Sequence, residues 1–184
     1  MTTYEVEVKV AASLDRVRSR LDALGAACRG AVRQDDTYYD APHREFAETD
    51  EAVRLRRCRT DAGETVRLTY KGPLVDAKSK TREEVETDVA DGDAVDAILR
   101  NLGFEPAATV CKDRERYELD GYTVTLDAVE DVGEFVEVEI DADEEEIASA
   151  RDGAYAVLER LDLDPDAQLQ TSYLAMVLES TSER

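Results

Sequence analysis

The stretch Tyr4-Glu5-Val6-Glu7-Val8-Lys9-Val10 sets the pattern that the rest of the chain follows. Successive side chains of a β-strand point to opposite faces, so Glu5, Glu7 and Lys9 share one face and the three valines share the other. The same alternation returns in nearly every later strand that the sequence predicts. It indicates a sheet with one apolar face and one face that carries rows of acids and bases.

Composition limits the class of protein. The 184 residues are 42% hydrophobic, enough to build the core of a single domain spanning 1–184. The formal net charge of −21 argues against nucleic acid as a partner, although a local basic pocket is compatible with it. The excess of Asp and Glu over Lys and Arg predicts a halophilic protein, adapted to a salt-rich cytoplasm, and an acidic protein of an ordinary cell is the alternative.

Cysteine and hydropathy patterns point to a cytoplasmic protein. Cys28, Cys58 and Cys111 lie far apart, and His43 has no ligand-spaced partner, so we expect reduced cysteines and no zinc site. No stretch approaches the roughly 18 apolar residues of a membrane span, and no charged-then-apolar leader precedes the first strand. We therefore expect no membrane partner.

Periodicity and turn signals divide the rest of the chain into strands and helices. The helix expected over 91–103 should face the core through Val95, Ile98, Leu99 and Leu102.

The chain also looks like a weak internal repeat, because a strand, a short helix and a long extended segment follow one another twice, first from Tyr4 and again from Thr81. Strands are expected over 27–40, 52–59, 64–71, 81–89, 107–119, 122–128 and 134–140, helices over 13–25, 91–103, 141–161 and 168–178, and loops over 43–50 and 76–80, the second of them mobile.

About eight antiparallel strands with three or four helices predict an α+β fold. Two architectures satisfy the alternation. In an open sheet, helices cover the apolar face and the charged face meets water. In a closed barrel, the apolar face points outward under helices and the charged face lines a lumen. Period-2 alternation alone does not choose between them.

The signs of the charges favour a pocket for a polyanion. A solvated sheet face in so acidic a chain should be mostly acidic, yet the scarce bases share the strand rows with the acids. Carboxylates bind hard divalent cations and bases bind phosphate, so the rows fit a triphosphate with its Mg²⁺ or Mn²⁺. Cross-strand ion pairing on an exposed sheet is the alternative. The bases are Arg54, Arg56, Lys71, Lys112, Arg114 and Arg116, and the acids are Glu5, Glu7, Asp127, Glu137 and Glu139.

An ordered set of motifs resembles the CYTH superfamily of triphosphate tunnel metalloenzymes. Glu5-Val6-Glu7-Val8-Lys9 is similar to its ExExK signature, and the resemblance covers essentially the whole chain. It implies a closed antiparallel eight-stranded β-barrel with helices packed outside. The further motifs are Asp36-Thr37-Tyr38-Tyr39-Asp40, Arg54-Leu55-Arg56, Lys71, Arg82 with Glu84, Lys112-Asp113-Arg114, Asp127 and Glu137-Val138-Glu139.

The resemblance also implies a role for each motif. Lys9, Asp127 and Arg114 would be catalytic. Arg116 has a rim ion pair as its alternative role, and Tyr38 and Tyr39 are expected to pack the barrel wall. The implied metal ligands are Glu5, Glu7, Asp127, Glu137 and Glu139, and the implied triphosphate-binding residues are Lys9, Arg54, Arg56, Lys71, Arg82, Lys112, Arg114 and Arg116.

Two functions follow from the resemblance, and a third hypothesis comes from another class of protein. The chain length, the Lys112-Asp113-Arg114 spacing and Ser172-Tyr173-Leu174 look most like the class IV adenylate cyclase branch, which converts ATP to cyclic AMP and pyrophosphate. A triphosphatase acting on inorganic tripolyphosphate or thiamine triphosphate is the first alternative. A non-catalytic nucleotide or polyphosphate binder is the second. A homodimer is compatible with the sequence.

Overall fold

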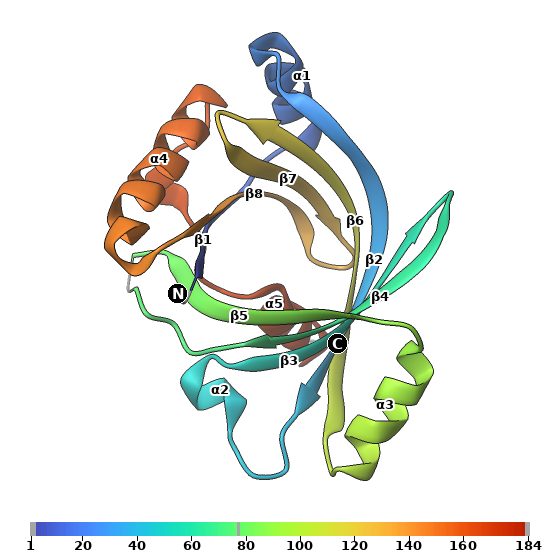
Figure 1. Ribbon diagram of the computed structural model, residues 1–184. Coiled ribbons are helices and arrows are strands. Elements are labelled where there is room, and N and C mark those ends of the chain that lie inside the picture. Colours follow the sequence, from blue (N-terminus) through green and yellow to red (C-terminus); the bar gives the residue numbers. More distant parts are fainter. Residues whose placement is uncertain (1–2, 77, 183–184) are drawn as a thin grey trace.

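Eight strands close into one barrel in the computed structural model, which describes residues 3–76 and 78–182. All neighbours pair antiparallel in the order β1-β5-β4-β3-β2-β6-β7-β8, and β8 pairs back with β1 (Figure 1). The predicted α+β barrel is confirmed, and the open sheet is excluded. The strands are β1 (Tyr4–Ala11), β2 (Ala27–Asp40), β3 (Ala52–Thr60), β4 (Gly63–Lys71), β5 (Lys80–Val89), β6 (Glu105–Leu119), β7 (Tyr122–Val129) and β8 (Gly133–Ala142).

Helices cover the outward apolar face of the barrel. α1 (Leu14–Leu24) and α4 (Ile147–Arg160) pack over β1, β7 and β8, where Leu21 and Leu158 are fully buried. α3 (Gly92–Asn101) packs over β3 and β4 through Leu99. α5 (Tyr173–Ser182) contacts β6, and Figure 1 shows it across the barrel opening. With the apolar faces covered from outside, the charged rows point inward.

The helix ends follow the sequence signals only in part. Gly25 adopts a left-handed conformation with a φ of 74° and ends α1, as predicted. At the other end, the Ser13 side chain makes no capping hydrogen bond, and the Leu14 amide donates instead to a Glu134 carboxylate oxygen at 3.1 Å. For α3, Asp91 is the N-cap and accepts from the Ala94 amide at 2.9 Å.

The strand order is compatible with the internal repeat. Exchanging β1 with β5, β2 with β6, β3 with β7 and β4 with β8 leaves the order around the barrel unchanged. The two strand–helix–strand units meet directly, since β1 pairs with β5 and β2 pairs with β6. The repeat therefore corresponds to two halves that complete one barrel together.

The prediction of which α3 residues face the core is wrong in part. Ile98 and Leu102 were expected to be inward but are 57% and 64% exposed. Of the four apolar residues, Leu99 alone is buried, and Val95 packs against the same cluster. The reason is that α3 contacts the barrel mainly at β3, so the residues that flank Leu99 on its apolar side face solvent.

Several boundaries also differ from the prediction. A short helix α2 (Phe46–Thr49) interrupts the expected loop, because Phe46 is buried and Asp50 with a φ of 54° closes the turn. The acidic run 144–146 forms a 3-10 turn before α4, and α5 begins later than expected, at Tyr173. Residue 77 of the loop predicted at 76–80 lies outside the described residues, and Lys80 already belongs to β5.

The described helices contain no segment long and apolar enough to span a membrane.

Candidate active site

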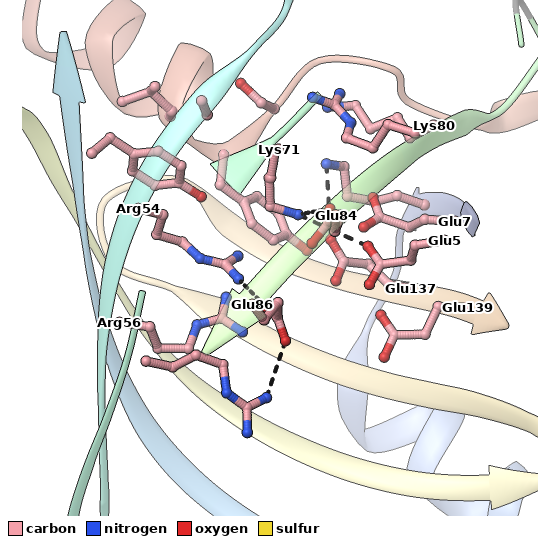
Figure 2. Close-up of a pocket in the computed structure, with 18 of the residues that line it drawn as sticks. Glu5, Glu7, Arg54, Arg56, Lys71, Lys80, Glu84, Glu86, Glu137 and Glu139 are labelled. Carbon is pink, nitrogen blue, oxygen red and sulfur yellow. Dashed lines mark hydrogen bonds and ion pairs between the residues drawn. The ribbon is translucent and has the colours of Figure 1, made fainter. Parts of the chain in front are cut away.

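The barrel encloses a charged cavity of about 360 Å³. Inward-facing residues of all eight strands line it, together with Asp50, Glu51 and the first turn of α5. Figure 2 shows Glu5, Glu7 and Glu139 on one wall, and Arg54 and Arg56 on the facing wall. The eight cations that the resemblance assigned to triphosphate binding all line this cavity: Lys9, Arg54, Arg56, Lys71, Arg82, Lys112, Arg114 and Arg116.

Three carboxylates form a compact acid cluster. One oxygen of each of Glu5, Glu7 and Glu139 lies within 4.8 Å of the others. The cluster results from sheet register, since Glu7 lies opposite Glu139 and Glu5 is two residues along the same face. Burial, and then the charge of Glu5, raise the pKa of Glu139 above its ordinary value.

The acid cluster fits a divalent cation. Its ligands are hard oxygens, which Mg²⁺ and Mn²⁺ prefer. Glu5 has its pKa raised by burial against the opposing effect of Lys71, whose ammonium is 3.9 Å away. Bringing three half-buried carboxylates together is costly unless protons or a cation offset their repulsion. Glu5, Glu7 and Glu139 would therefore hold the metal.

Asp127 and Glu137 lie in an ion network beside that cluster. Asp127 is fully buried and accepts hydrogen bonds from Arg114 Nε at 2.6 Å and from Lys112 Nζ at 3.1 Å. Glu137 contacts the Arg114 guanidinium and lies 3.9 Å from Lys9 Nζ. Burial alone would raise the pKa of both acids, but Arg114 and Lys112 lower it in each case.

Other wall cations are held by acids of β5 and by Asp50. Arg54 Nη2 lies 3.2 Å from a Glu86 oxygen, and the Lys71 ammonium contacts Glu84. Arg82 Nη2 lies 2.8 Å from an Asp50 carboxylate oxygen at the barrel mouth. These pairs fix the direction of each cation before any ligand enters.

Arg116 differs from these cations. Its side chain is exposed at the cavity, and it makes no hydrogen bond or ion pair with any other residue of 3–76 and 78–182 that the structure records. The rim ion pair considered from the sequence is therefore absent among the described residues. Of the two tyrosines expected in the wall, Tyr38 lines the cavity, while the Tyr39 hydroxyl donates to Asp96 at 2.6 Å.

Lys80 is a cavity residue that sequence reasoning missed. It lies opposite Glu7 in the β1–β5 register, and its ammonium forms no ion pair within the described part of the chain. Burial lowers its pKa to about 8, against the opposing effect of Glu7. The signal was present, because Lys80 has the same parity as Arg82, Glu84 and Glu86, but the strand was expected to begin one residue later.

The first turn of α5 was also missed as part of the site. Ser172, Tyr173 and Leu174 line the cavity. The Tyr173 ring lies against two ammonium groups, with Lys9 Nζ 4.2 Å and Lys112 Nζ 4.8 Å from its centroid. The apolar pattern of α5 predicted only that Tyr173 packs in the core, which it also does, beside Phe135.

Comparison with known families gives the site its context. The model of the CYTH domain matches residues 3–173. The chain belongs to the CYTH family. A CYTH relative from Methanocaldococcus jannaschii, provisionally named adenylate cyclase, is 34% identical over 174 residues, which cover 94% of this chain and 97% of the relative. The adenylate cyclase CyaB of Aeromonas hydrophila is 28% identical over 145 residues, 77% of this chain and 71% of that protein.

Solved structures share the fold of this chain. A protein from Pyrococcus horikoshii matches with a TM-score of 0.89 and 37% identity, over 95% of this chain and 98% of that one. A Hippeastrum protein matches with a TM-score of 0.64 and 17% identity, over 88% of each chain. The latter is described as a provisional adenylyl cyclase with a dominant triphosphatase activity, and at this identity it supports the fold alone.

Proposed function

We propose that this CYTH protein is a divalent-metal-dependent enzyme that acts on a triphosphate inside the barrel, converting ATP to cyclic AMP and pyrophosphate. The observation that carries the proposal is the meeting of the Glu5–Glu7–Glu139 cluster with rows of cations in one cavity of the barrel. The adenylate cyclase names of its relatives support the choice of reaction.

The residues would divide the work by charge. Mg²⁺ or Mn²⁺, when bound, supplies positive charge at the reacting phosphate and lowers the pKa of a bound hydroxyl. Arg54 and Arg56 of β3 and Lys71 of β4 would hold the phosphate chain together with Lys112 and Arg114 of β6. Asp127 would act by positioning, because its two oxygens fix the Arg114 fork and the Lys112 ammonium.

In the cyclase reaction, the ribose 3′-oxygen bonds to the α-phosphorus while the bond from that phosphorus to the α–β bridging oxygen breaks. The 3′-hydroxyl proton leaves and negative charge develops on the pyrophosphate. Lys9 and Arg114 meet at Glu137, so they would stabilise this charge from one point in the cavity. Their positions are set by the folded barrel, so little reorganisation is needed at the moment of reaction.

Triphosphate hydrolysis is the second candidate, and the cavity lining favours it. Most lining side chains are charged, which suits a phosphate chain and leaves few apolar surfaces for an adenine ring. The uncharged lining residues are Tyr38, Ala52, Thr123, Ser172, Tyr173 and Leu174.

Product analysis tests both candidates. The protein is incubated in high salt with Mg²⁺ or Mn²⁺ and, separately, ATP, thiamine triphosphate and inorganic tripolyphosphate. Cyclic AMP and pyrophosphate from ATP, lost in Glu5→Gln and Glu137→Gln, are the expected result. Glu83→Gln is the matched control, because Glu83 is exposed on β5 and is not among the cavity residues. Orthophosphate without cyclic product would establish the hydrolase, and no turnover would leave a binding protein.

A further inference from the structure

The first turn of α5 presents a helix N-terminus to the cavity. Ser172 is its N-cap residue, since its hydroxyl oxygen accepts from the Ala175 amide at 3.1 Å and its carbonyl accepts from the Met176 amide at 3.0 Å. The backbone amides of Tyr173 and Leu174 lie in the first turn of the helix. No helical carbonyl precedes them by four residues, so the helix itself cannot accept their hydrogen bonds. Helix N-termini carry partial positive charge and bind anions.

Tyr173 joins this turn to one cation of β1 and one cation of β6. Its ring lies 4.2 Å from Lys9 Nζ and 4.8 Å from Lys112 Nζ, within the range of a cation–π contact. Among the described residues, the Lys9 ammonium pairs only with Glu137, at a distance of 3.9 Å, so its N–H donors keep capacity for a ligand. The Leu169 amide donates to the Lys9 carbonyl at 2.7 Å, which ties the segment before α5 to β1 at the same residue.

The hydroxyl of Tyr173 is an independent sign of a ligand. The residue is 6% exposed, and its buried oxygen has no hydrogen-bond partner within the described part of the chain. Buried hydroxyls nearly always have a partner. Burial raises the pKa of Tyr173 well above its ordinary value, and the nearby carboxylates Glu137 and Asp127 raise it further, so the group stays protonated as a donor.

We propose that the first turn of α5 is a phosphate-binding subsite of the barrel, in which the Tyr173 hydroxyl donates a hydrogen bond to a phosphoryl oxygen. The Tyr173 ring, in the same subsite, positions the ammonium groups of Lys9 and Lys112. The ligand chemistry is a phosphate chain, whether inorganic or part of a nucleotide. The inference rests on the proposed triphosphate function, and it adds the residue that closes the site from the helical side.

Binding without turnover tests the subsite. The full chain is titrated calorimetrically with inorganic tripolyphosphate in high salt and EDTA, and then with ATP. Tyr173→Phe removes only the hydroxyl, and Tyr173→Leu also removes the electron-rich ring. Ser180→Ala is the control on the same helix, because its hydroxyl bonds the Val177 carbonyl instead of facing the cavity.

Tyr173→Phe is expected to weaken both ligands about tenfold, the value of a hydrogen bond to a charged group. Tyr173→Leu should weaken them further, and Ser180→Ala should leave both affinities unchanged. Variants are compared only where their thermal midpoint matches the parent. Parent-like affinity of Tyr173→Phe for both ligands would overturn the subsite, as would a loss for ATP alone, since that would make Tyr173 a contact of the nucleoside.

The two proposals fail separately. A parent protein that binds tripolyphosphate through Tyr173 but converts none of the three substrates refutes the enzyme and leaves the subsite intact. A parent that converts ATP while Tyr173→Phe binds both ligands normally refutes the subsite alone.

Discussion

Arg56 and Asp36 form a bidentate pair inside the barrel: Arg56 Nε and Nη2 each lie 2.7 Å from a different carboxylate oxygen of Asp36. The pair links β3 to β2, where the two residues are direct cross-strand partners. Asp36 is buried, so the guanidinium fork is fixed in direction before a ligand arrives. Arg56 can therefore offer a phosphate chain only its remaining donors.

Asp36→Asn should destabilise the protein by about 2–4 kcal/mol, because it leaves a mostly buried guanidinium, 13% exposed, without its counter-ion. Urea denaturation measures the change. The double variant Asp36→Asn with Arg56→Met should recover much of the loss, since it removes the orphaned charge as well. A single variant as stable as the parent would show that the pair contributes no stability.

The same pair predicts an acid response. Burial alone would raise the pKa of Asp36, but Arg56 outweighs it, and the folded-state pKa lies below the ordinary value. A lowered folded pKa means that the stabilisation is complete above the unfolded value of about 3.9 and is lost as the pH falls below it. The parent should lose stability in acid more steeply than Asp36→Asn. Equal slopes in denaturation series from pH 5 to pH 2 would contradict this.

Metal affinity should depend on the acid cluster. Glu7→Gln or Glu139→Gln should weaken Mn²⁺ binding about tenfold or more, because each removes a charged oxygen ligand from a site of three. Affinity should also rise with pH, since the pKa of Glu139 is raised and the metal must displace its proton. Calorimetric titration checks both, with Glu83→Gln as the control. Parent-like binding in both variants would place the metal elsewhere.

The sequence predicted the barrel rows well because strand parity is a local property. Each charged residue on the face of Glu5 or Arg114 had to point inward once the sheet closed. Closure of the barrel depends on the register between β8 and β1, which the alternation of side chains does not encode. The closed barrel was therefore predicted only from the resemblance to CYTH proteins. The internal pairing of Arg56 with Asp36 and the approach of Tyr173 to Lys9 involve residues distant in the chain, and no local pattern indicates them.

The helix α3 shows the same limit and offers a test. Ile98 and Leu99 are neighbours with equal hydrophobicity, but only Leu99 is buried. Ile98→Ala should change the free energy of unfolding by about 0.5 kcal/mol or less, while Leu99→Ala should cost about 2–4 kcal/mol. Chemical denaturation of the two variants compares them directly. Equal losses would mean that α3 packs through both positions.

Lys80 should contribute to substrate binding even though no motif marked it. Its ammonium faces the cavity without an ion pair among the described residues, so a phosphate chain would be its first close counter-ion. Lys80→Met keeps the length of the stem and removes the charge, and should raise the KM for the triphosphate about tenfold. Lys78→Met is the matched control, because Lys78 is exposed and its recorded contacts use only its backbone.

The dependence of tripolyphosphate affinity on pH shows whether Lys80 acts through its charge. Because the pKa of Lys80 is lowered to about 8, the unliganded parent should lose affinity for tripolyphosphate as the pH rises past 8. The pKa of Lys112 is also lowered to about 8, so Lys112 loses its charge over the same pH range. The variant Lys80→Met should therefore still lose some affinity for tripolyphosphate as the pH rises. Lys80→Arg should stay charged and hold its affinity to higher pH. If Lys80→Met and Lys78→Met have the same KM and the same dependence of affinity on pH, Lys80 makes no contact with the substrate. The other cations of the cavity then suffice for binding.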